Sequence, residues 1–397
     1  MPHRPASSFP LSIIILLGAL TAFGPLSIDM YLPAFPAIKA ELQAAHGAVE
    51  TTVAAFLFSM GVCQLIYGPL SDRFGRRTPL MTGCVLFSLG ALGCGVARSI
   101  EGLFFARLLQ GVGGAAGVVI ARACVRDRLN ETDSARIFSQ LMLVMGIAPI
   151  LAPWFGAQVL HFASWRGIFL LLTGFGALCW FSVFRFLPET LPPSRRSGGG
   201  RTLRNFGLLL RDRPFLGYIL SGGFNSGVLF SYIAGSPFVF MQYHHLSVSQ
   251  YTYLFGANAF GIIVTAQWNQ WLLRRRSPER LLSLAFLSNA IFGLLLIFHG
   301  VSGFGGFPAL VALIFCSLSG VGIAFPNLAA AALAAHRNHA GSASALLGAA
   351  QFLVGASAGF LVGSLNDGTP HAIASVMGGC GIACWVTLTL LTSPARR

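Results

Sequence analysis

The sequence predicts an all-α membrane protein whose chain crosses the bilayer twelve times. Of its 397 residues, 55% are hydrophobic and only 10% are charged, whereas soluble domains carry about 25% charged residues. The apolar residues form blocks of roughly twenty, which is the length that a helix needs to cross a bilayer. Short clusters of arginine separate many of these blocks. Such clusters are expected where cytoplasmic loops hold a membrane protein in its orientation.

Twelve apolar blocks follow one another along the chain, and each predicts one span. A signal peptide is the alternative for the first block. That block is long, however, ends in Asp29-Met30-Tyr31-Leu32-Pro33 and leads into many further spans, which argues against a signal peptide. The twelve blocks cover about residues 10–33, 49–71, 79–97, 101–124, 134–160, 164–187, 214–241, 249–273, 279–300, 307–334, 341–364 and 370–392.

The distribution of basic residues predicts the orientation. If the amino terminus lies inside, 22 of the 26 basic residues fall on the inner side. The outer side receives Lys39, Arg98 and Arg166, and Arg107 is left inside a span. This bias supports an even number of spans with both termini in the cytoplasm. We therefore attribute the net charge of +14 to membrane topology and expect no nucleic-acid partner.

A polar stretch in the middle of the chain divides the twelve spans into two sets of six. It is rich in Pro, Ser, Gly and Arg and is typical of a linker. The sequence Arg76-Arg77-Thr78-Pro79 after span 2 matches Arg275-Arg276-Ser277-Pro278 after span 8 at an offset of 199, which indicates an internal duplication. We predict an N-terminal six-helix bundle (1–190), a cytoplasmic linker (191–213) and a C-terminal six-helix bundle (214–397) around a central cavity.

Several classes of enzyme are excluded by the residues that are missing. Lys39 is the single lysine and the residue directly before it is Ile38 rather than glycine, so the chain has no phosphate-binding loop of the form GxxxxGK[ST]. No HExxH motif occurs among the nine histidines, and the eight cysteines form no ligand or disulfide framework. We expect no metal and no cofactor. A membrane-embedded enzyme would need converging catalytic residues that the sequence does not offer, and a channel is disfavoured by the duplication.

The loop after span 2 carries the pattern GxLxDRxGRR, which is the signature of the major facilitator superfamily. Gly75 allows the short loop to turn, and Asp72 opposes the helix dipole and so needs a compensating partner. We expect Asp127, at the end of span 4, to pair with Arg73. The resemblance implies the major facilitator fold and a loop that latches the cytoplasmic side, with a plain basic loop as the alternative. The pattern and its expected partner comprise Gly68, Asp72, Arg73, Gly75, Arg76, Arg77 and Asp127.

Span 4 contains Arg107, and burying an arginine in a bilayer span costs about 2.5–3.5 kcal/mol or more. Its side chain should therefore face a cavity or a partner. Arg107-Leu108-Leu109-Gln110-Gly111 resembles the span-4 motif of drug–proton antiporters, in which the arginine is associated with proton coupling. Asp29 in span 1 lies at a similar depth, about 6–9 Å from the outer boundary. We expect the two groups to couple transport to protons. The alternatives are a structural arginine and an aspartate at headgroup level.

Span 5 contains two prolines, which bend a helix. It resembles the antiporter motif GxxxGPxxGG but has Ala148, Ala152 and Ala157 at three of the glycine positions. These substitutions keep the positions small and weaken the motif as evidence for antiport. The matching residues are Gly146, Pro149, Pro153 and Gly156.

Other polar and small residues inside spans have less specific interpretations. Glycines at intervals of four in span 11, Gly355, Gly359 and Gly363, predict close helix packing. Glu189, after span 6, resembles another loop motif of the superfamily and predicts an electrostatic role at a helix end. Candidates for the cavity wall, which could equally bond neighbouring helices, are Tyr31, Gln110, Asn225, Tyr232, Asn258, Asn327 and Gln351.

The match becomes closer over several segments spread along the chain. Residues 25–36, Ala152-Pro153, residues 189–193, residues 254–258 and Phe325-Pro326-Asn327 are similar to the Bcr/CflA drug-resistance transporters. This resemblance implies proton-driven efflux of drugs or small amphiphilic metabolites across a bacterial inner membrane. We expect the protein to function as a monomer, although the sequence does not show its oligomeric state. Some members export cysteine or dipeptides, and a proton-coupled importer of the same fold is the alternative. Nothing in the sequence chooses the substrate.

Overall fold

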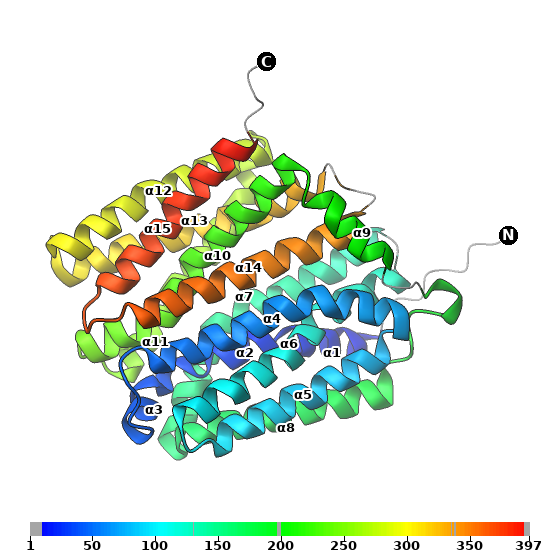
Figure 1. Ribbon diagram of the computed structural model, residues 1–397, viewed down its shortest axis with the longest axis horizontal. Helices are drawn as coiled ribbons and strands as arrows, with labels where there is room; N and C mark the ends of the chain where they lie inside the picture. Colours follow the sequence, from blue (N-terminus) through cyan, green and yellow to red (C-terminus); the bar gives the residue numbers. More distant parts are fainter. Residues whose placement is uncertain (1–9, 130, 197–199, 335, 337–338, 393–397) are drawn as a thin grey trace.

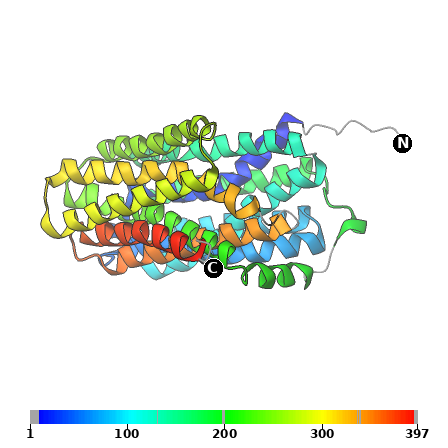
Figure 2. The same cartoon turned by 90° about the horizontal axis from the view of Figure 1, so that it is seen from above.

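The computed structural model describes residues 10–129, 131–196, 200–334, 336 and 339–392. In these ranges the chain forms helices and no strand, and the all-α membrane fold is confirmed. The long helices run alongside one another in both views, with the N-terminal half (blue to blue-green) next to the C-terminal half (green to red) (Figures 1 and 2). The prediction that both termini are cytoplasmic concerns residues 1–9 and 393–397, which lie outside the described residues.

The N-terminal half is built from long helices joined by short connections. Its elements are α1 (Leu11–Thr21), α2 (Phe23–Asp29), the 3-10 turn η1 (Leu32–Ala34), α3 (Phe35–Glu41), α4 (Ala48–Phe74), α5 (Arg77–Val96), α6 (Ile100–Arg128), α7 (Glu131–Phe162) and α8 (Trp165–Phe186). Below, the end of the molecule with the α4–α5 connection is called the loop end. The end with the α3–α4 connection is called the far end.

The first predicted span, 10–33, is broken rather than continuous. α1 and the following segment Phe23–Glu41 are bent by 44° at a short break. Pro25 accounts for this break, because proline lacks the N–H that would bond Thr21 and its ring crowds that carbonyl. The side chain of Asp29 is thereby placed at the end of a short helix, where the direction of the chain changes.

The C-terminal half is also built from long helices joined by short connections. Its elements are α10 (Arg213–Pro237), the π-helical turn η3 (Phe238–Tyr243), α11 (Val248–Leu272), α12 (Pro278–Ser302), α13 (Gly306–Ala334), α14 (Ala340–Ser364) and α15 (His371–Thr392). Pro237, at the end of α10, removes one helical hydrogen bond and precedes the wider π turn.

The number of spans agrees with twelve when the polar helix α11 is included. Among the described residues, ten helices are long and apolar enough to cross a membrane, and the bent first pair raises the number to eleven. α11 has 25 residues, as many as α12 and α14, but its Asn and Gln residues make it less apolar. Large side chains such as Phe105, Leu178 and Phe298 are exposed along the spans, as expected where lipid is the solvent.

The linker contains a helix that the sequence did not predict. α9 (Gly200–Leu209) follows the 3-10 turn η2 (Pro193–Arg195) and lies beside the start of α14 (Figure 1). Phe206 and Leu209 are buried against the C-terminal half. An apolar face docked in this way stabilises a short helix that would be marginal alone. The predicted boundaries of the two bundles remain predictions.

The two halves meet mainly along two helix pairs. α4 packs against α14 and α7 against α11. The glycines of α14 allow close approach on both sides. A Cβ added to Gly363 would lie 2.8 Å from the carbonyl oxygen of Gly47, which precedes α4, and one added to Gly355 would lie 2.3 Å from the ring of Phe230 on α10, within the C-terminal half. The stripe of small residues expected in span 11 is therefore a packing surface, as predicted.

Candidate functional site

The loop between α4 and α5 is tight because Gly75 adopts a backbone conformation that other residues avoid. Its φ is +90°, and a Cβ there would lie 2.4 Å from Oε2 of Glu189. Glycine is therefore required both for conformation and for space. Gly68, in the preceding turn of α4, has no heavy atom within 4 Å of an added Cβ. The two motif glycines thus have different local requirements.

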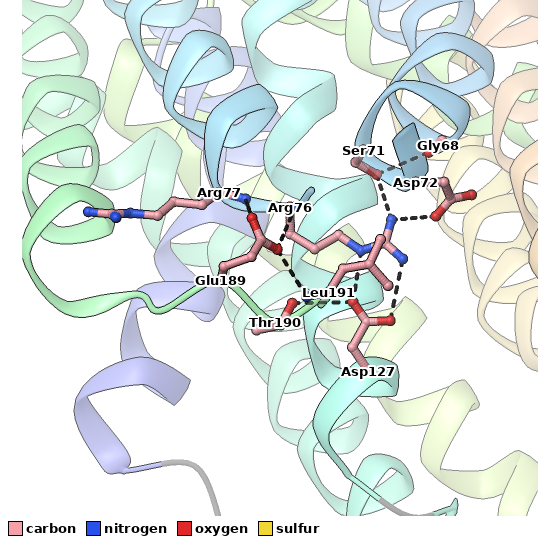
Figure 3. Close-up of polar contacts among 9 residues, drawn as sticks. All are labelled: Gly68, Ser71, Asp72, Arg76, Arg77, Asp127, Glu189, Thr190 and Leu191. Atoms are coloured by element: carbon pink, nitrogen blue, oxygen red, sulfur yellow. Dashed lines mark hydrogen bonds and ion pairs between the residues drawn. The ribbon is translucent and has the colours of Figure 1, made fainter. Parts of the chain in front are cut away.

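Arg76 forms the centre of the polar network at the loop end (Figure 3). Its Nη1 donates to Oδ1 of Asp72 at 2.5 Å and to Oγ of Ser71 at 2.8 Å. Its Nε donates to Oδ2 of Asp127 at 2.8 Å, and Oγ1 of Thr190 also donates to that oxygen. The Arg76 side chain is almost fully buried. It therefore links the end of α4 to the end of α6.

The partner predicted for Asp127 was Arg73, and this prediction is wrong. Arg73 is exposed, and its guanidinium lies 5.3 Å from the ring centre of Phe74. Because the turn at Gly75 reverses the direction of the chain, the side chain of Arg76 lies next to Asp127. Asp72 does receive the compensating partner that its position at the helix end requires, and that partner is Arg76.

Glu189 caps the N-terminus of α5. Its carboxylate accepts hydrogen bonds from the backbone N–H of Arg76 at 2.8 Å and of Arg77 at 3.2 Å, and from that of Leu191 at 2.9 Å. Free N–H groups and the helix dipole make a helix start favourable for a carboxylate. The predicted electrostatic role of Glu189 at a helix end thus takes the form of a cap supplied by the segment after α8.

The cap also affects the acidity of Glu189. Burial raises the pKa of this carboxyl, but the three backbone donors and the nearby Arg196 guanidinium outweigh burial and hold the pKa of Glu189 below its usual range. A carboxyl whose pKa is lowered by folding stabilises the folded state above its unfolded pKa. The contribution is lost as the pH falls through the lowered value.

Arg77 turns away from this network, although it is part of the same motif. Its guanidinium donates to the backbone oxygen of Phe184, near the end of α8, and lies over the aromatic ring of the same residue. In Figure 3, Arg77 extends to the opposite side of Glu189 from Arg76. Together, Arg76, Arg77 and Glu189 fix the ends of α4, α5, α6 and α8 to one another. The arrangement suits a structural clamp rather than bond-breaking chemistry.

Arg107 is fully buried within the N-terminal half. Its Nη1 donates to the backbone oxygen of Ser27 at 3.0 Å and to Oε1 of Gln110 at 2.7 Å. The guanidinium lies 4.9 Å from the ring centre of Tyr31 and 4.5 Å from that of Phe56. Aromatic faces stabilise a cation in this way. Its Nε and Nη2 have no hydrogen-bond partner among the described residues, so the charge is only partly compensated.

Asp29 is buried on the side of the N-terminal half that meets the C-terminal half. It is 3% exposed and accepts no hydrogen bond within the described part of the chain. It lies within electrostatic range of the hydroxyl groups of Tyr232 and Tyr251, which belong to α10 and α11. Among the described residues no ion pair joins Asp29 to Arg107 in this conformation. Their expected role in coupling transport to protons remains a prediction.

The two ends of the α7 motif face different neighbours. A Cβ added to Gly156 would lie 2.1 Å from the carbonyl oxygen of Met30, so α7 passes very close to the chain beside Asp29. Gly146 faces Ile263 of α11, in the other half. Pro149 and Pro153 both lie inside α7. The motif therefore places α7 between the Asp29 region and the C-terminal half.

The cavity-wall candidates separate into two groups. Tyr232 accepts a hydrogen bond from Nδ2 of Asn258 at 3.0 Å and lies near Asp29. The others mainly join helices: Tyr31 bonds Thr52, Gln110 bonds Ser27 and Arg107, Asn225 bonds Asn289, and Asn327 bonds Asn269. Gln351 is half-buried on α14.

A hollow of about 540 Å³ lies between α11 and α13. Leu254, Phe307, Val311 and Phe315 line it, and Asn258 adds a polar group. This hollow belongs to the C-terminal half and does not correspond to the predicted central cavity, whose existence remains an expectation. Among the described residues, no group of three or more His, Cys, Asp or Glu side chains could hold a metal ion.

A helical protein that spans a membrane many times, in two halves with a buried carboxyl and a buried guanidinium, has the architecture of a membrane carrier. Residues 17–393 match the sequence model of the Major Facilitator Superfamily. The chain therefore belongs to the Major Facilitator Superfamily, and its resemblance to the Bcr/CflA family is confirmed.

Three known proteins illustrate this relationship. The uncharacterized MFS-type transporter YdgK of Bacillus subtilis is 36% identical over 386 residues, covering 95% of this chain and 94% of the relative. The bicyclomycin resistance protein homolog of Haemophilus influenzae is 30% identical, covering 96% of each chain. The crystal structure of a D-xylose–proton symporter superposes with a TM-score of 0.78 at 12% identity, covering 96% of this chain and 98% of that one, and supports the fold.

Sequence reasoning missed two contributions to the loop-end network. Oγ of Ser71 accepts a hydrogen bond from Arg76 and donates one to the carbonyl oxygen of Gly68, and Oγ1 of Thr190 donates one to Asp127. Ser71 directly precedes the motif aspartate, and Thr190 directly follows the capping glutamate. Their position directly beside charged motif residues could have predicted that they take part in this network.

Proposed function

We propose that this protein is a proton-coupled secondary transporter that exports drugs or small amphiphilic metabolites across the bacterial inner membrane. The bias of arginines toward one side supports an internal amino terminus, which places the loop end in the cytoplasm and the far end outside. The proton gradient would supply the energy, and no cofactor is required. One chain would suffice, because both six-helix bundles belong to the same polypeptide.

The observation that carries this proposal is Asp29. Its carboxyl is buried next to the opposite half and has no hydrogen-bond partner within the described ranges of the chain, so it is costly to keep charged. Rocking of the halves would change its access to water and so its affinity for a proton. Arg107 would keep a positive potential in the same half, without forming an ion pair in the conformation described.

The similarity to the bicyclomycin resistance protein homolog supports both export as the direction of transport and a drug as the substrate. An importer of a nutrient predicts the opposite direction. A panel of antibiotics in a pump-deficient host that overproduces the protein would identify the substrate class.

Everted membrane vesicles with an imposed pH gradient test the proposal. Efflux predicts that the antibiotic selected by the panel accumulates inside everted vesicles when their lumen is acidic. Asp29→Asn should abolish accumulation, because the amide cannot exchange a proton. The matched control is Asp367→Asn, which changes an exposed acid in a connecting loop and should leave accumulation intact. Normal proton-driven accumulation by Asp29→Asn would remove this residue from the mechanism, and movement in the opposite direction would establish import.

A further inference from the structure

A second buried acid lies at the far end, where the two halves touch. Glu50 is in the first turn of α4 and is only 4% exposed. Nδ2 of Asn366, which follows α14 in the other half, lies 3.5 Å from Oε1 of Glu50. Glu50 therefore lies on the contact between the halves rather than inside one of them.

The backbones of the two halves meet beside this acid. Gly47 precedes α4 with a φ of +78°, and a Cβ on it would lie 1.8 Å from the carbonyl oxygen of Gly363. A second contact closes the same end: Nζ of Lys39 donates to Oε1 of Gln242 in η3 at 3.0 Å. Water is excluded from Glu50 because these contacts close around it, and separating the halves there would expose the carboxyl.

The charge of Glu50 is poorly compensated in the closed arrangement. Among the described residues, its own backbone N–H donates to it, the titratable groups that act on it are Lys39 and Tyr31, and the segment after α14 contributes the neutral amide of Asn366. Lys39 is engaged with Gln242 and His46, and among the described residues no ion pair joins it to Glu50. The hydroxyl of Tyr31 is bonded to Thr52. A buried carboxylate without a paired cation is costly, whereas the protonated acid is not.

We propose that Glu50 is a second proton-binding site, whose protonation from outside allows the two halves to close at the far end. This inference rests on the proposed function and deepens it. When the far end is open, Glu50 meets external water and is charged. Closing requires that it bind a proton. A transporter that has released its cargo outside would thus return to the inward-facing form only after taking up a proton there, which is the order that an exporter needs.

The position of Glu50 near the start of a helix also has a purely structural explanation. A carboxylate in the first turn interacts favourably with the helix dipole. Glu101 is the matched control, because it lies in the first turn of α6 at the same end but is exposed. Glutamine replaces each acid with little change in shape, so Glu50→Gln and Glu101→Gln remove the charge and the titration while leaving the side-chain volume.

Hydrogen–deuterium exchange of the full-length protein in lipid nanodiscs tests the proposal. Exchange at pH 5.5 and 8.5 is compared after correction for chemical exchange, in peptides that cover residues 42–50 and 363–368. If one carboxyl controls closure, the ratio of open to closed forms rises by up to about tenfold per pH unit across its titration. Wild type and Glu101→Gln should therefore exchange faster at high pH, whereas Glu50→Gln should stay protected at both pH values.

Two results would overturn the inference. One is a wild-type far end whose corrected exchange is the same at both pH values. The other is a Glu50→Gln protein that keeps the wild-type pH response. Asp29→Asn separates this inference from the proposed function, because its far end should still respond to pH even though proton-driven accumulation is lost. Exchange at the far end does not depend on knowing the substrate, so either proposal can fail alone.

Discussion

Arg73 and Arg76 lie three positions apart in one loop motif and have different surroundings. Arg76 is buried and bonds two carboxylates, whereas Arg73 extends from the end of α4 into an exposed position. The acid at the end of span 4 could be predicted as the partner of a motif arginine. The sequence could not show which arginine contacts this acid, because that depends on the direction in which the chain leaves the turn at Gly75.

Removing either arginine distinguishes the two roles. Arg76→Ala leaves Asp127 partly buried without its cation and should lower the free energy of unfolding by on the order of 3 kcal/mol. Arg73→Ala should change it by less than about 0.5 kcal/mol, because the side chain is exposed. Thermal unfolding of the two purified variants in the same detergent measures the difference. Equal losses of stability would contradict the assignment of Arg76 as the central residue of the network.

At the scale of elements, sequence patterns located the long helices well and their interruptions poorly. The predicted span 164–187 and the helix Trp165–Phe186 agree to within a residue, since the apolar block ends where the helix ends. The first span was predicted as one helix because hydropathy does not register a break between two apolar segments. Pro25 was the residue that predicts the break. The helix Gly200–Leu209 was missed because its glycine-rich start suggested a flexible chain, and its stability depends on docking.

Substituting alanine for Gly75 or Gly68 tests the different roles of these two glycines in the loop motif. Gly75→Ala must adopt a positive φ and displace Glu189, so it should loosen the cap of α5, and the strain alone costs about 1–2 kcal/mol. Gly68→Ala meets no atom within 4 Å in this conformation and should be tolerated. Thermal unfolding and drug accumulation in everted vesicles give two independent readouts. If Gly68→Ala impaired transport without loss of stability, Gly68 would be required in a conformation other than this one.

At the scale of the whole molecule, the halves are joined by close backbone contacts along α4 and α14. The number of halves and their order could be predicted from the arginine loops and the internal duplication. Their relative position could not, because that depends on side chains far apart in sequence, such as Gly61 against Leu353. The same limit applies to Asp29 and Arg107: both were identified as buried charges, but their separation in this conformation was not predictable from depth alone.

A larger side chain at the contact between the halves should favour other conformations over this one. A Cβ on Gly61 would lie 2.9 Å from Cγ of Leu353 and 3.1 Å from its backbone nitrogen. Gly61→Val should therefore destabilise the described conformation by about 1–3 kcal/mol and slow the transport cycle. Gly174→Val, on α8, is the control, because an added Cβ there meets nothing within 4 Å. Initial rates of accumulation that are equal in the two variants would show that α4 and α14 need not approach this closely.

The modest hydropathy of α11 has a consequence for biosynthesis. Its polar side chains include Asn258 and Asn269, which are buried and bonded to Tyr232 on α10 and Asn327 on α13. Before α13 is in place, the amide of Asn269 lacks its partner Asn327 and faces lipid, which is unfavourable. α11 should therefore pass from the translocon into the lipid less readily than the other segments. We expect it to be held stably in the bilayer only after α13 has been made. The last third of the chain would then assemble cooperatively rather than one segment at a time.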